Sequence, residues 1–317
     1  MNLLVTGGSG FIGSNFIEMI LQTKRESITK VINLDALTYA GNFNNTADFA
    51  DDEKYFFEKV NLCDLSELLS IFVKHDITQV VHLAAESHVD NSILNPDAFI
   101  QSNIIGTFNL LKVARRCGVK RFHHVSTDEV YGELGETGKF QESTPYNPQN
   151  PYSASKAASD FLVSSYFHTY DFPITISNCS NNYGPRQHNE KFIPTVINSI
   201  LNKKKIPLYG EGLNVRDWIY VRDHCEGIWK VLESGKLGET YCIGANCEKR
   251  NIEIIKLICN SMGVDPLDSL EYVKDRAGHD YRYAIDNKKI KEKLNWKPKT
   301  SFEEGMRKTI EWYCEKH

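Results

Sequence analysis

The sequence predicts an α/β protein built on a doubly wound parallel sheet, because short apolar runs alternate with amphipathic helical stretches. The first apolar run, residues 3–6, leads directly into the glycine-rich segment 7–13, after which apolar residues recur at helical spacing. A second run over residues 31–34 ends at Asp35, roughly 20 residues beyond the last glycine. A strand, a glycine turn, a helix and a second strand that ends in an acid indicate a Rossmann-type sheet that binds a dinucleotide.

The length and composition are those of a globular chain with room for a second part. At 317 residues the chain is long for one domain. We expect a dinucleotide-binding core over residues 1–180, to which later segments return, and a smaller mixed α/β substrate-binding part mainly over residues 181–317. Hydrophobic and charged residues make up 41% and 25%, and the net charge of −4 argues against bulk attraction to nucleic acid or an anionic membrane.

The sequence shows neither a targeting signal nor a metal-site pattern. No apolar run approaches the length of a membrane span, and the first residues lack the basic start of a signal peptide. The eight cysteines are scattered, without a CxxC pair or a metal-ligand spacing. We therefore expect a cytoplasmic protein with reduced thiols, no membrane partner and no metal.

The glycine-rich turn predicts the cofactor. Its glycines recur at every third position, at Gly7, Gly10 and Gly13. Such a turn lets the backbone approach a pyrophosphate and aims a helix amino terminus at its charge. Asp35 is placed to bind the ribose hydroxyls, and since no arginine follows it, NAD is preferred over NADP. The alternative for Asp35 is a turn residue at the start of a loop.

The alternation of strands and helices continues through the first half of the chain. We expect strands over residues 54–60, 79–83, 121–125 and 173–178, and helices over residues 64–74, 96–117 and 151–170. The small residues Ala84 and Ala85 would let a cofactor pass close to the end of their strand. Residues 131–150 and 181–186 are rich in Gly, Pro and Asn, which predicts surface loops.

A hydroxyl and two carboxylates follow the strand over residues 121–125. They are Thr127, Asp128 and Glu129, and ligands collect at this end of parallel strands. A threonine there can hydrogen-bond a substrate hydroxyl, and the two acids can divide into acid and base if their surroundings separate their pKa values. The alternative is a helix-start cluster without chemistry.

Tyr152 and Lys156 stand four residues apart and therefore share one face of the helix over residues 151–170. An ammonium near the phenol favours phenolate and lowers the pKa of the tyrosine, and a cationic nicotinamide ring adds to the effect. The pair is suited to removing an alcohol proton while hydride leaves the carbon. The alternative is an ordinary helix start, with Pro151 at its first position.

Basic residues recur at isolated positions in the second half, at Lys191, Arg216, Arg222, Arg276 and Arg282. Several of them converging would bind a diphosphate, for which arginine has suitable bidentate geometry. The alternative for each is a solvated surface charge.

With these motifs in view, the chain resembles the extended short-chain dehydrogenase/reductases, and within them the dTDP-glucose 4,6-dehydratases. The resemblance runs from residue 3 to about residue 313. It rests on the segments GGSGFIG (7–13), LTYAGN (37–42), LAAESHVD (83–90), STDEVYG (126–132), YSASK (152–156) and NCSNNYGP (178–185). The Thr-Asp-Glu stretch is the specific one, because related epimerases typically lack the acid pair.

The resemblance implies a reaction on one bound nucleotide sugar, dTDP-glucose. Tyr152, helped by Thr127, removes the C4 hydroxyl proton while hydride passes to NAD. Glu129 then takes the C5 proton as Asp128 protonates the departing C6 hydroxyl, and hydride returns to C6. The product is dTDP-4-keto-6-deoxyglucose, and NAD is regenerated. The alternatives are another nucleotide-sugar 4,6-dehydratase or 4-epimerase of the family, and a non-catalytic NAD-binding regulator.

The resemblance also implies contacts, residue by residue. Beside the catalytic Thr127, Asp128, Glu129, Tyr152 and Lys156, the cofactor contacts are Gly7, Gly10, Phe11, Ile12, Gly13, Asp35, Ala36, Leu37, Thr38, Asn61, Leu62, Leu83, Ala84, Ala85, Glu86, Ser87, Ser102, Tyr152, Lys156 and Asn182. The substrate contacts are Ser87, Thr127, Asn181, Lys191, Phe192, Pro207, Leu208, Tyr209, Arg216, Asn251, Asp275, Arg276 and His279.

Four positions depart from the family pattern. Asn61 stands for an aspartate at adenine, Ser102 for a threonine, Asn91 for an arginine and Ala277 for a proline. The family is dimeric, so the resemblance implies a homodimer that pairs the helices over residues 96–117 and 151–170 of each subunit.

Overall fold

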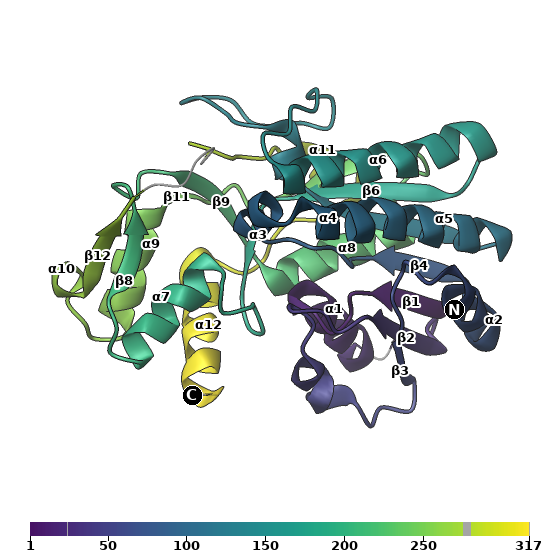
Figure 1. The fold of residues 1–317 in the computed structure, drawn as a ribbon, viewed down its shortest axis with the longest axis horizontal. Coiled ribbons are helices and arrows are strands. Elements are labelled where there is room, and N and C mark those ends of the chain that lie inside the picture. The colour runs from purple at the N-terminus through teal and green to yellow at the C-terminus, as the bar shows by residue number, and fades with distance from the viewer. Residues whose placement is uncertain (24, 275–279, 317) are drawn as a thin grey trace.

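The computed structural model describes residues 1–23, 25–274 and 280–316 (Figure 1). Within these residues, seven parallel strands form one sheet in the order β10-β6-β5-β4-β1-β2-β3. Its strands are β1 (Asn2–Thr6), β2 (Lys30–Asp35), β3 (Tyr55–Lys59), β4 (Gln79–His82), β5 (Arg121–Thr127), β6 (Ile174–Cys179) and β10 (Thr240–Ile243). The predicted Rossmann-type, doubly wound α/β fold is therefore confirmed.

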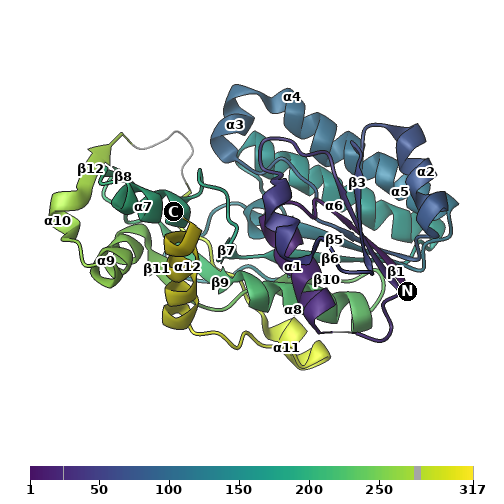
Figure 2. The same cartoon turned by 90° about the horizontal axis from the view of Figure 1, so that it is seen from below.

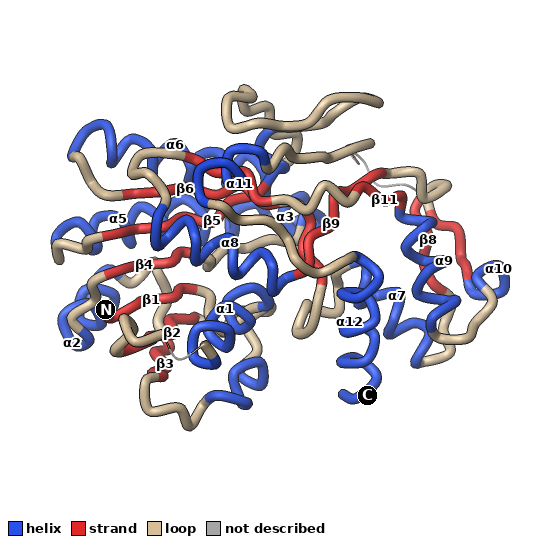
Figure 3. The backbone as a smooth tube through the Cα atoms, turned by 180° about the vertical axis from the view of Figure 1, so that it is seen from behind, coloured by secondary structure: helices blue, strands red, loops and turns tan. Residues whose placement is uncertain are grey.

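Both faces of the large sheet are covered by helices, because alternate strand residues point to opposite sides. In β1, Leu4 packs against one helical layer, whereas Leu3 and Val5 pack against the other. The first layer contains α2 (Leu65–His75), α5 (Thr107–Arg116) and α6 (Pro151–Tyr170), and the second contains α1 (Phe11–Gln22) and α8 (Val221–Ser234). Figure 2 shows the strands between α5 and α6 on one side and α1 and α8 on the other, and Figure 3 shows the same sheet from behind with its strands in red.

The helix α6, which carries Tyr152 and Lys156, has strong local start and stop signals. The Asn150 side chain accepts a hydrogen bond from the Ser153 backbone N–H at 2.9 Å, and Pro151 occupies the first turn. The helix ends at Asp171, which adopts a left-handed conformation with φ 52°. The predicted bounds of this helix, residues 151–170, agree with the structure.

A smaller part is attached where the carboxyl ends of the large sheet lie (Figure 2). It contains a sheet of order β11-β9-β7 and the pair β12-β8. Its elements are β7 (Asn181–Tyr183), α7 (Phe192–Leu201), β8 (Ile206–Tyr209), β9 (Val215–Tyr220), β11 (Glu248–Arg250), α9 (Asn251–Ser261), α10 (Pro266–Ser269), β12 (Leu270–Val273) and α12 (Phe302–Lys316). Between β9 and β11 the chain returns to the large sheet as α8 and β10, while α11 (Lys288–Leu294) packs against both. The domain boundary at residue 180 stays a prediction.

Three local predictions need correction. The helix expected over residues 96–117 is divided into α4 (Pro96–Phe99), the π-helical η2 (Ile100–Gly106) and α5, because the backbone hydrogen bonds widen over η2. The strand expected to end at residue 125 continues to Thr127, since Ser126 and Thr127 pair with β6. Residues 181–183, expected in a loop, form β7 because they pair with β9.

Three short elements of the described chain remain, of which η3 contributes Asp128 and Glu129 to the cavity described below. They are η1 (Phe43–Phe49), α3 (Val89–Leu94) and η3 (Asp128–Tyr131). Among the helices described here, none has both the length and the apolar character needed to cross a membrane.

Candidate active site

A cavity of about 310 Å³ lies along the carboxyl ends of the central strands. Its wall contains all five residues predicted to be catalytic and every predicted cofactor contact except Leu37. The predicted substrate contacts Ser87, Thr127, Asn181 and Lys191 also line it. Their roles remain predictions, but the structure brings these residues together around one space.

The glycine turn shows why only glycine fits beside this cavity. Gly7 has φ +69°, and a Cβ there would lie 2.8 Å from the Ala84 backbone. A Cβ on Gly13 would lie 2.2 Å from the Gly7 carbonyl oxygen. The turn therefore brings β1, β4 and the start of α1 into close contact, with Phe11 and Ile12 on the cavity wall. A helix amino terminus at a cavity wall suits a pyrophosphate.

Asp35 ends β2 and is held at the wall by backbone donors. Its two carboxylate oxygens accept hydrogen bonds from the Ser9 N–H at 2.9 Å and the Leu37 N–H at 2.8 Å. Burial raises the pKa of Asp35, and these two hydrogen bonds counteract that effect. Leu37 lies off the wall, so its part is to orient the carboxylate. Together with the glycine turn, this arrangement fits NAD.

Asn61 also lies on the wall, where the family commonly has an aspartate. Its Oδ1 accepts a hydrogen bond from the Cys63 N–H at 2.9 Å. Ser102, the second departure, lines the same cavity from η2. Neither substitution removes a polar side chain from the wall.

Thr127 and Asp128 are coupled at the end of β5. The Thr127 hydroxyl donates a hydrogen bond to an Asp128 carboxylate oxygen at 3.4 Å. The same hydroxyl accepts a hydrogen bond from the Glu129 N–H at 3.3 Å and so caps the start of η3. Asp128 is 2% exposed. Burial, followed by the charges of Glu129 and Asp217, raises the pKa of Asp128 well above its ordinary value. Burial therefore favours the protonated form of Asp128, beside the half-buried Glu129.

Tyr152 and Lys156 line the cavity from the first turns of α6, but their coupling differs from the expectation. Burial raises the pKa of Tyr152 well above its ordinary value, followed by the charge of Glu129. A hydrogen bond with Thr127 acts in the opposite direction. The Lys156 amino group donates to the Val125 carbonyl oxygen at 2.9 Å, and burial lowers the lysine pKa. The expected lowering of the Tyr152 pKa by Lys156 is therefore outweighed in this structure by burial of the phenol.

The predicted substrate residues divide into two groups. Lys191 donates from Nζ to the Ser87 carbonyl oxygen at 2.7 Å and so links the smaller part to the cavity. Six further predicted substrate contacts lie off the cavity wall, in or at the start of elements of the smaller part: Phe192, Pro207, Leu208, Tyr209, Arg216 and Asn251. Asp275, Arg276 and His279, with Ala277, lie outside the described residues.

The predicted cations are mostly engaged with protein groups. Arg216 donates to the Asp280 carbonyl oxygen at 2.9 Å, and its guanidinium carbon lies 4.4 Å from the Tyr283 ring centre. Arg282 forms an ion pair with Glu248 at 2.6 Å. Arg282 is therefore a structural cation, whereas Arg216 lies near enough to Asp128 for its charge to lower that acid's pKa.

Several wall residues were missed by sequence reasoning. They are Leu34, Ala40, Gly41, Val60, Val125, Ser126, Cys179, Ser180, Gln187, His188 and Glu190. Ser126, Cys179 and Ser180 lie within the segments STDEVYG and NCSNNYGP. Their position at the ends of predicted strands could therefore have placed them at the cavity wall. Residues 187–190 carry no periodic pattern, and only the approach of the smaller part places them at the wall.

Known proteins are similar over nearly the whole chain. A family model described as GDP-mannose 4,6 dehydratase matches residues 4–309. The dTDP-glucose 4,6-dehydratase of Neisseria gonorrhoeae is 48% identical, over 99% of this chain and 96% of that protein.

Solved structures agree with this family assignment. The dTDP-glucose 4,6-dehydratase of Streptomyces venezuelae, solved with NAD bound, has a TM-score of 0.96 at 44% identity, covering 99% of this chain and 97% of that one. The UDP-glucose 4-epimerase of Thermus thermophilus, also with NAD, has a TM-score of 0.91 at 29% identity, covering 99% of both chains. The chain therefore belongs to the GDP-mannose 4,6 dehydratase family and groups with its dTDP-glucose 4,6-dehydratases.

Proposed function

We propose that this chain is an NAD-dependent hydro-lyase that converts dTDP-glucose to dTDP-4-keto-6-deoxyglucose. The observation that carries the proposal is the acid pair at the end of β5, beside Tyr152 and Lys156 on the wall of one cavity. Burial favours the protonated form of Asp128, next to the more exposed Glu129. Elimination of water requires one group that donates a proton and a second group that accepts one. Oxidation of the alcohol alone requires neither of these two carboxyl groups.

The cofactor site is assigned to the glycine turn, Asp35 and the strand-end residues around Ala84. The backbone of the turn binds the pyrophosphate, and Asp35 accepts hydrogen bonds from the adenosine ribose. When bound, NAD supplies the hydride chemistry, accepting hydride from C4 of the sugar and returning it to C6.

The first proton leaves through Tyr152. Its phenol shares a hydrogen bond with Thr127, so both groups can hold the C4 hydroxyl while the proton moves to the phenol oxygen. Because burial alone keeps Tyr152 protonated, the phenolate needs nearby positive charge. Lys156, one helical turn away, provides it.

Elimination uses the two acids separately. The 4-keto group acidifies C5, and Glu129 takes that proton. Asp128, whose protonated form is favoured by burial, donates its proton to the C6 oxygen as the C–O bond breaks. After hydride reaches C6, a proton returns to C5, so the net change is the loss of one water.

We further propose a homodimer that pairs α5 and α6 with the same helices of a second copy. These helices and the adjoining η2 leave large apolar side chains exposed: Ile100, Ile105, Phe108 and Phe161. Exposed apolar residues concentrated on neighbouring elements are typical of interaction sites.

The direct test is incubation of the purified protein with dTDP-glucose or with UDP-glucose, followed by mass spectrometry. The proposal expects loss of one water from dTDP-glucose without added NAD. The variant Asp128→Asn/Glu129→Gln is the matched control and should produce little product. A C4 epimer formed with no loss of water would instead assign the chain an epimerase activity.

A further inference from the structure

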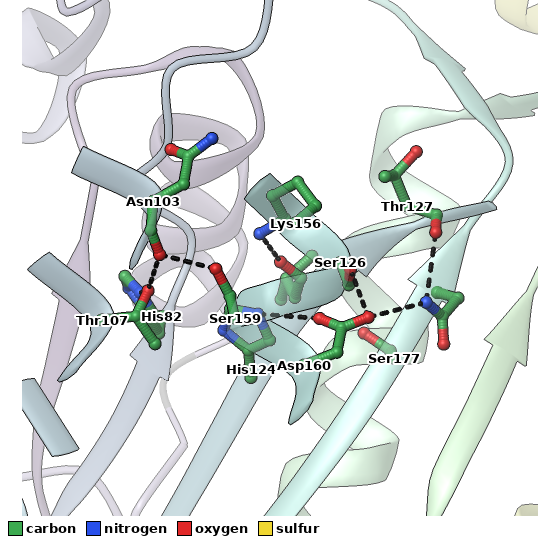
Figure 4. A network of polar contacts seen from close by, with 12 residues as sticks. His82, Asn103, Thr107, His124, Ser126, Thr127, Lys156, Ser159, Asp160 and Ser177 are labelled. Carbon is green, nitrogen blue, oxygen red and sulfur yellow. Dashed lines mark hydrogen bonds and ion pairs between the residues drawn. The ribbon is translucent and has the colours of Figure 1, made fainter. Parts of the chain in front are cut away.

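A buried carboxylate lies directly beneath the proposed catalytic residues. Asp160 follows Lys156 by one turn of α6, is 2% exposed, and points into the interior toward β5 and β6 (Figure 4). Its Oδ2 accepts hydrogen bonds from the Ser126 hydroxyl at 2.8 Å, the Tyr146 hydroxyl at 2.9 Å and the Asn178 amide at 3.4 Å. The mechanism above gives this acid no role, although burying a carboxylate is costly.

The groups that face Asp160 leave Lys156 as its ionic partner. His124, on β5, has Nε2 3.1 Å from Asp160 Oδ1, but burial lowers the pKa of His124 well below its ordinary value, so the ring is neutral. The phenols of Tyr146 and of Tyr131 in η3 have raised pKa values, mainly through burial, and are neutral as well. Lys156 is the cation whose charge lowers the pKa of Asp160.

The same interaction acts on the lysine. Burial lowers the pKa of Lys156, and the charge of Asp160 is the largest influence that raises it. An ammonium has three donor hydrogens, one of which goes to the Val125 carbonyl oxygen. The three hydrogen bonds of Asp160 described above all go to Oδ2, and its Oδ1 lies 3.1 Å from His124 Nε2, so the carboxylate acts on Lys156 through its charge. The remaining ammonium donors stay available to the cavity.

Asp160 also links α6 to the strand ends that carry the substrate-facing groups. Asn178 donates both to Asp160 and to the Thr127 carbonyl oxygen, the latter at 3.1 Å. Figure 4 shows this path from the helix, through the amide, to Thr127. The separation between helix and strand end is therefore set by bonds to one buried carboxylate.

We propose that Asp160 is a positioning residue for the first oxidation, which keeps Lys156 in its ammonium form and fixes α6 against the ends of β5 and β6. The inference rests on the proposed function, because it assigns Asp160 to the step in which Tyr152 accepts the C4 hydroxyl proton. Asp160 itself touches neither sugar nor cofactor.

This role of Asp160 implies that the rate of the first oxidation depends on pH. Burial raises the pKa of Asp160 to about 6, even though Lys156 and the three hydrogen-bond donors lower it. Above that pH the carboxylate is charged and supports the lysine. As the pH falls through about 6, Asp160 becomes neutral and its attraction for the Lys156 ammonium is lost. The helix α6 is then held less firmly against the strand ends, and the first oxidation slows.

The test measures this step alone. The measurement uses the Glu129→Gln variant, in which the reaction should stop after the first oxidation. This variant also removes the Glu129 carboxylate, so that Glu129 cannot affect the pH profile. Single-turnover reduction of bound NAD, followed by absorbance after mixing with dTDP-glucose, is recorded across pH 5 to pH 9. We expect an acid limb with a midpoint of about 6. Adding Asp160→Asn should slow the plateau rate about tenfold or more, with unchanged half-saturating substrate, and remove the limb.

Tyr146→Phe is the second variant, and it shifts the limb instead of removing it. The Tyr146 hydroxyl lowers the pKa of Asp160, so its loss should move the midpoint to higher pH while the plateau rate remains. Retained NAD and an unchanged circular dichroism spectrum verify that each protein is folded. If Asp160→Asn does not fold, the direction of the Tyr146→Phe shift decides.

The outcomes separate the two proposals. If Glu129→Gln never reduces its NAD with dTDP-glucose, the proposed function is overturned. If it does so without an acid limb, or keeps the same limb after Asp160→Asn or Tyr146→Phe, the function stands and the role of Asp160 is overturned.

Discussion

The Thr127 hydroxyl lies 3.4 Å from an Asp128 carboxylate oxygen, so groups assigned to two different chemical steps are hydrogen-bonded to each other. Thr127 belongs to the oxidation at C4, and Asp128 to the elimination at C5 and C6. Because neighbouring residues divide the steps, substitutions at this strand end should separate hydride transfer from loss of water.

The first prediction concerns the acid pair. Asp128→Asn and Glu129→Gln preserve side-chain volume, so packing should survive. Each variant should still reduce its bound NAD when dTDP-glucose is added, yet release product at least about a hundredfold more slowly. Exchange of the C5 proton with solvent deuterium, followed by mass spectrometry, should fall most in Glu129→Gln. A double variant that dehydrates as fast as the parent would show that both assignments are wrong.

The second prediction concerns the stability of Asp128→Asn. The folded-state pKa of Asp128 lies well above the ordinary 3.8, mainly through burial. Stability from this group is therefore complete below that pH and is lost as the pH rises toward the folded value. The asparagine variant has no such loss. Urea titrations measure the free energy of unfolding of both proteins. Between pH 4 and pH 7 the value for Asp128→Asn should rise relative to that of the parent. A difference that stays constant with pH would contradict the raised pKa of Asp128.

The third prediction concerns Tyr152. Tyr152→Phe keeps the ring but removes the base, so reduction of bound NAD should fall by about 10²-fold or more while the fold remains. Stopped-flow absorbance measures the rate. Tyr146→Phe changes a half-buried phenol that donates to Asp160 on α6; it is the matched control and should keep its plateau rate. Near-normal oxidation by Tyr152→Phe would place the base elsewhere.

The fourth prediction concerns the cofactor. The purified protein should release NAD on denaturation, and Asp35→Ala should weaken its retention because the ribose loses its carboxylate partner. Asp64→Ala is the control, since this helix cap accepts hydrogen bonds from Ser66 and Glu67 at the start of α2 and lies off the cavity wall. It should lower the stability of the protein slightly and release no NAD. Chromatography of the released nucleotide identifies it, and finding NADP would contradict the assignment.

The fifth prediction concerns the oligomer. Phe161 on α6 is 64% exposed, so Phe161→Glu should convert a dimer to monomers if these helices pair. Val73 on α2 is 71% exposed but lies outside the proposed interface, and Val73→Glu should remain dimeric. Sedimentation velocity distinguishes the two states. A monomeric parent, or a Phe161→Glu dimer, would exclude this interface.

Sequence reasoning succeeds where burial imposes a local period. The apolar run over residues 3–6 and Pro151 at the start of its helix are read directly from the sequence, and the structure agrees with both. It fails where distant contacts decide. The trio Asn181–Tyr183 is polar and looks like a loop, but pairing with β9 makes it a strand.

The same limit applies to the candidate site. The strand ends and the glycine spacing predict most residues of the cavity wall, because the carboxyl ends of parallel strands lie at the same edge of the sheet. Neither His124 nor Asp160 belongs to a motif that the sequence made recognisable. Only the packing of α6 on β5 shows that they meet, and only burial shows that Tyr152 does not have a low pKa without further positive charge.

The place of β10 at the edge of the large sheet affects how the protein is made. β6 pairs with β5 on one side and with β10 on the other, yet β10 leaves the ribosome only after β7, β8, β9 and α8. Until Thr240–Ile243 is synthesised, β6 presents unpaired backbone donors and acceptors, which attract strands of other chains. A fragment that ends at residue 180 is therefore a template for aggregation, and the growing chain depends on its second half to close the sheet.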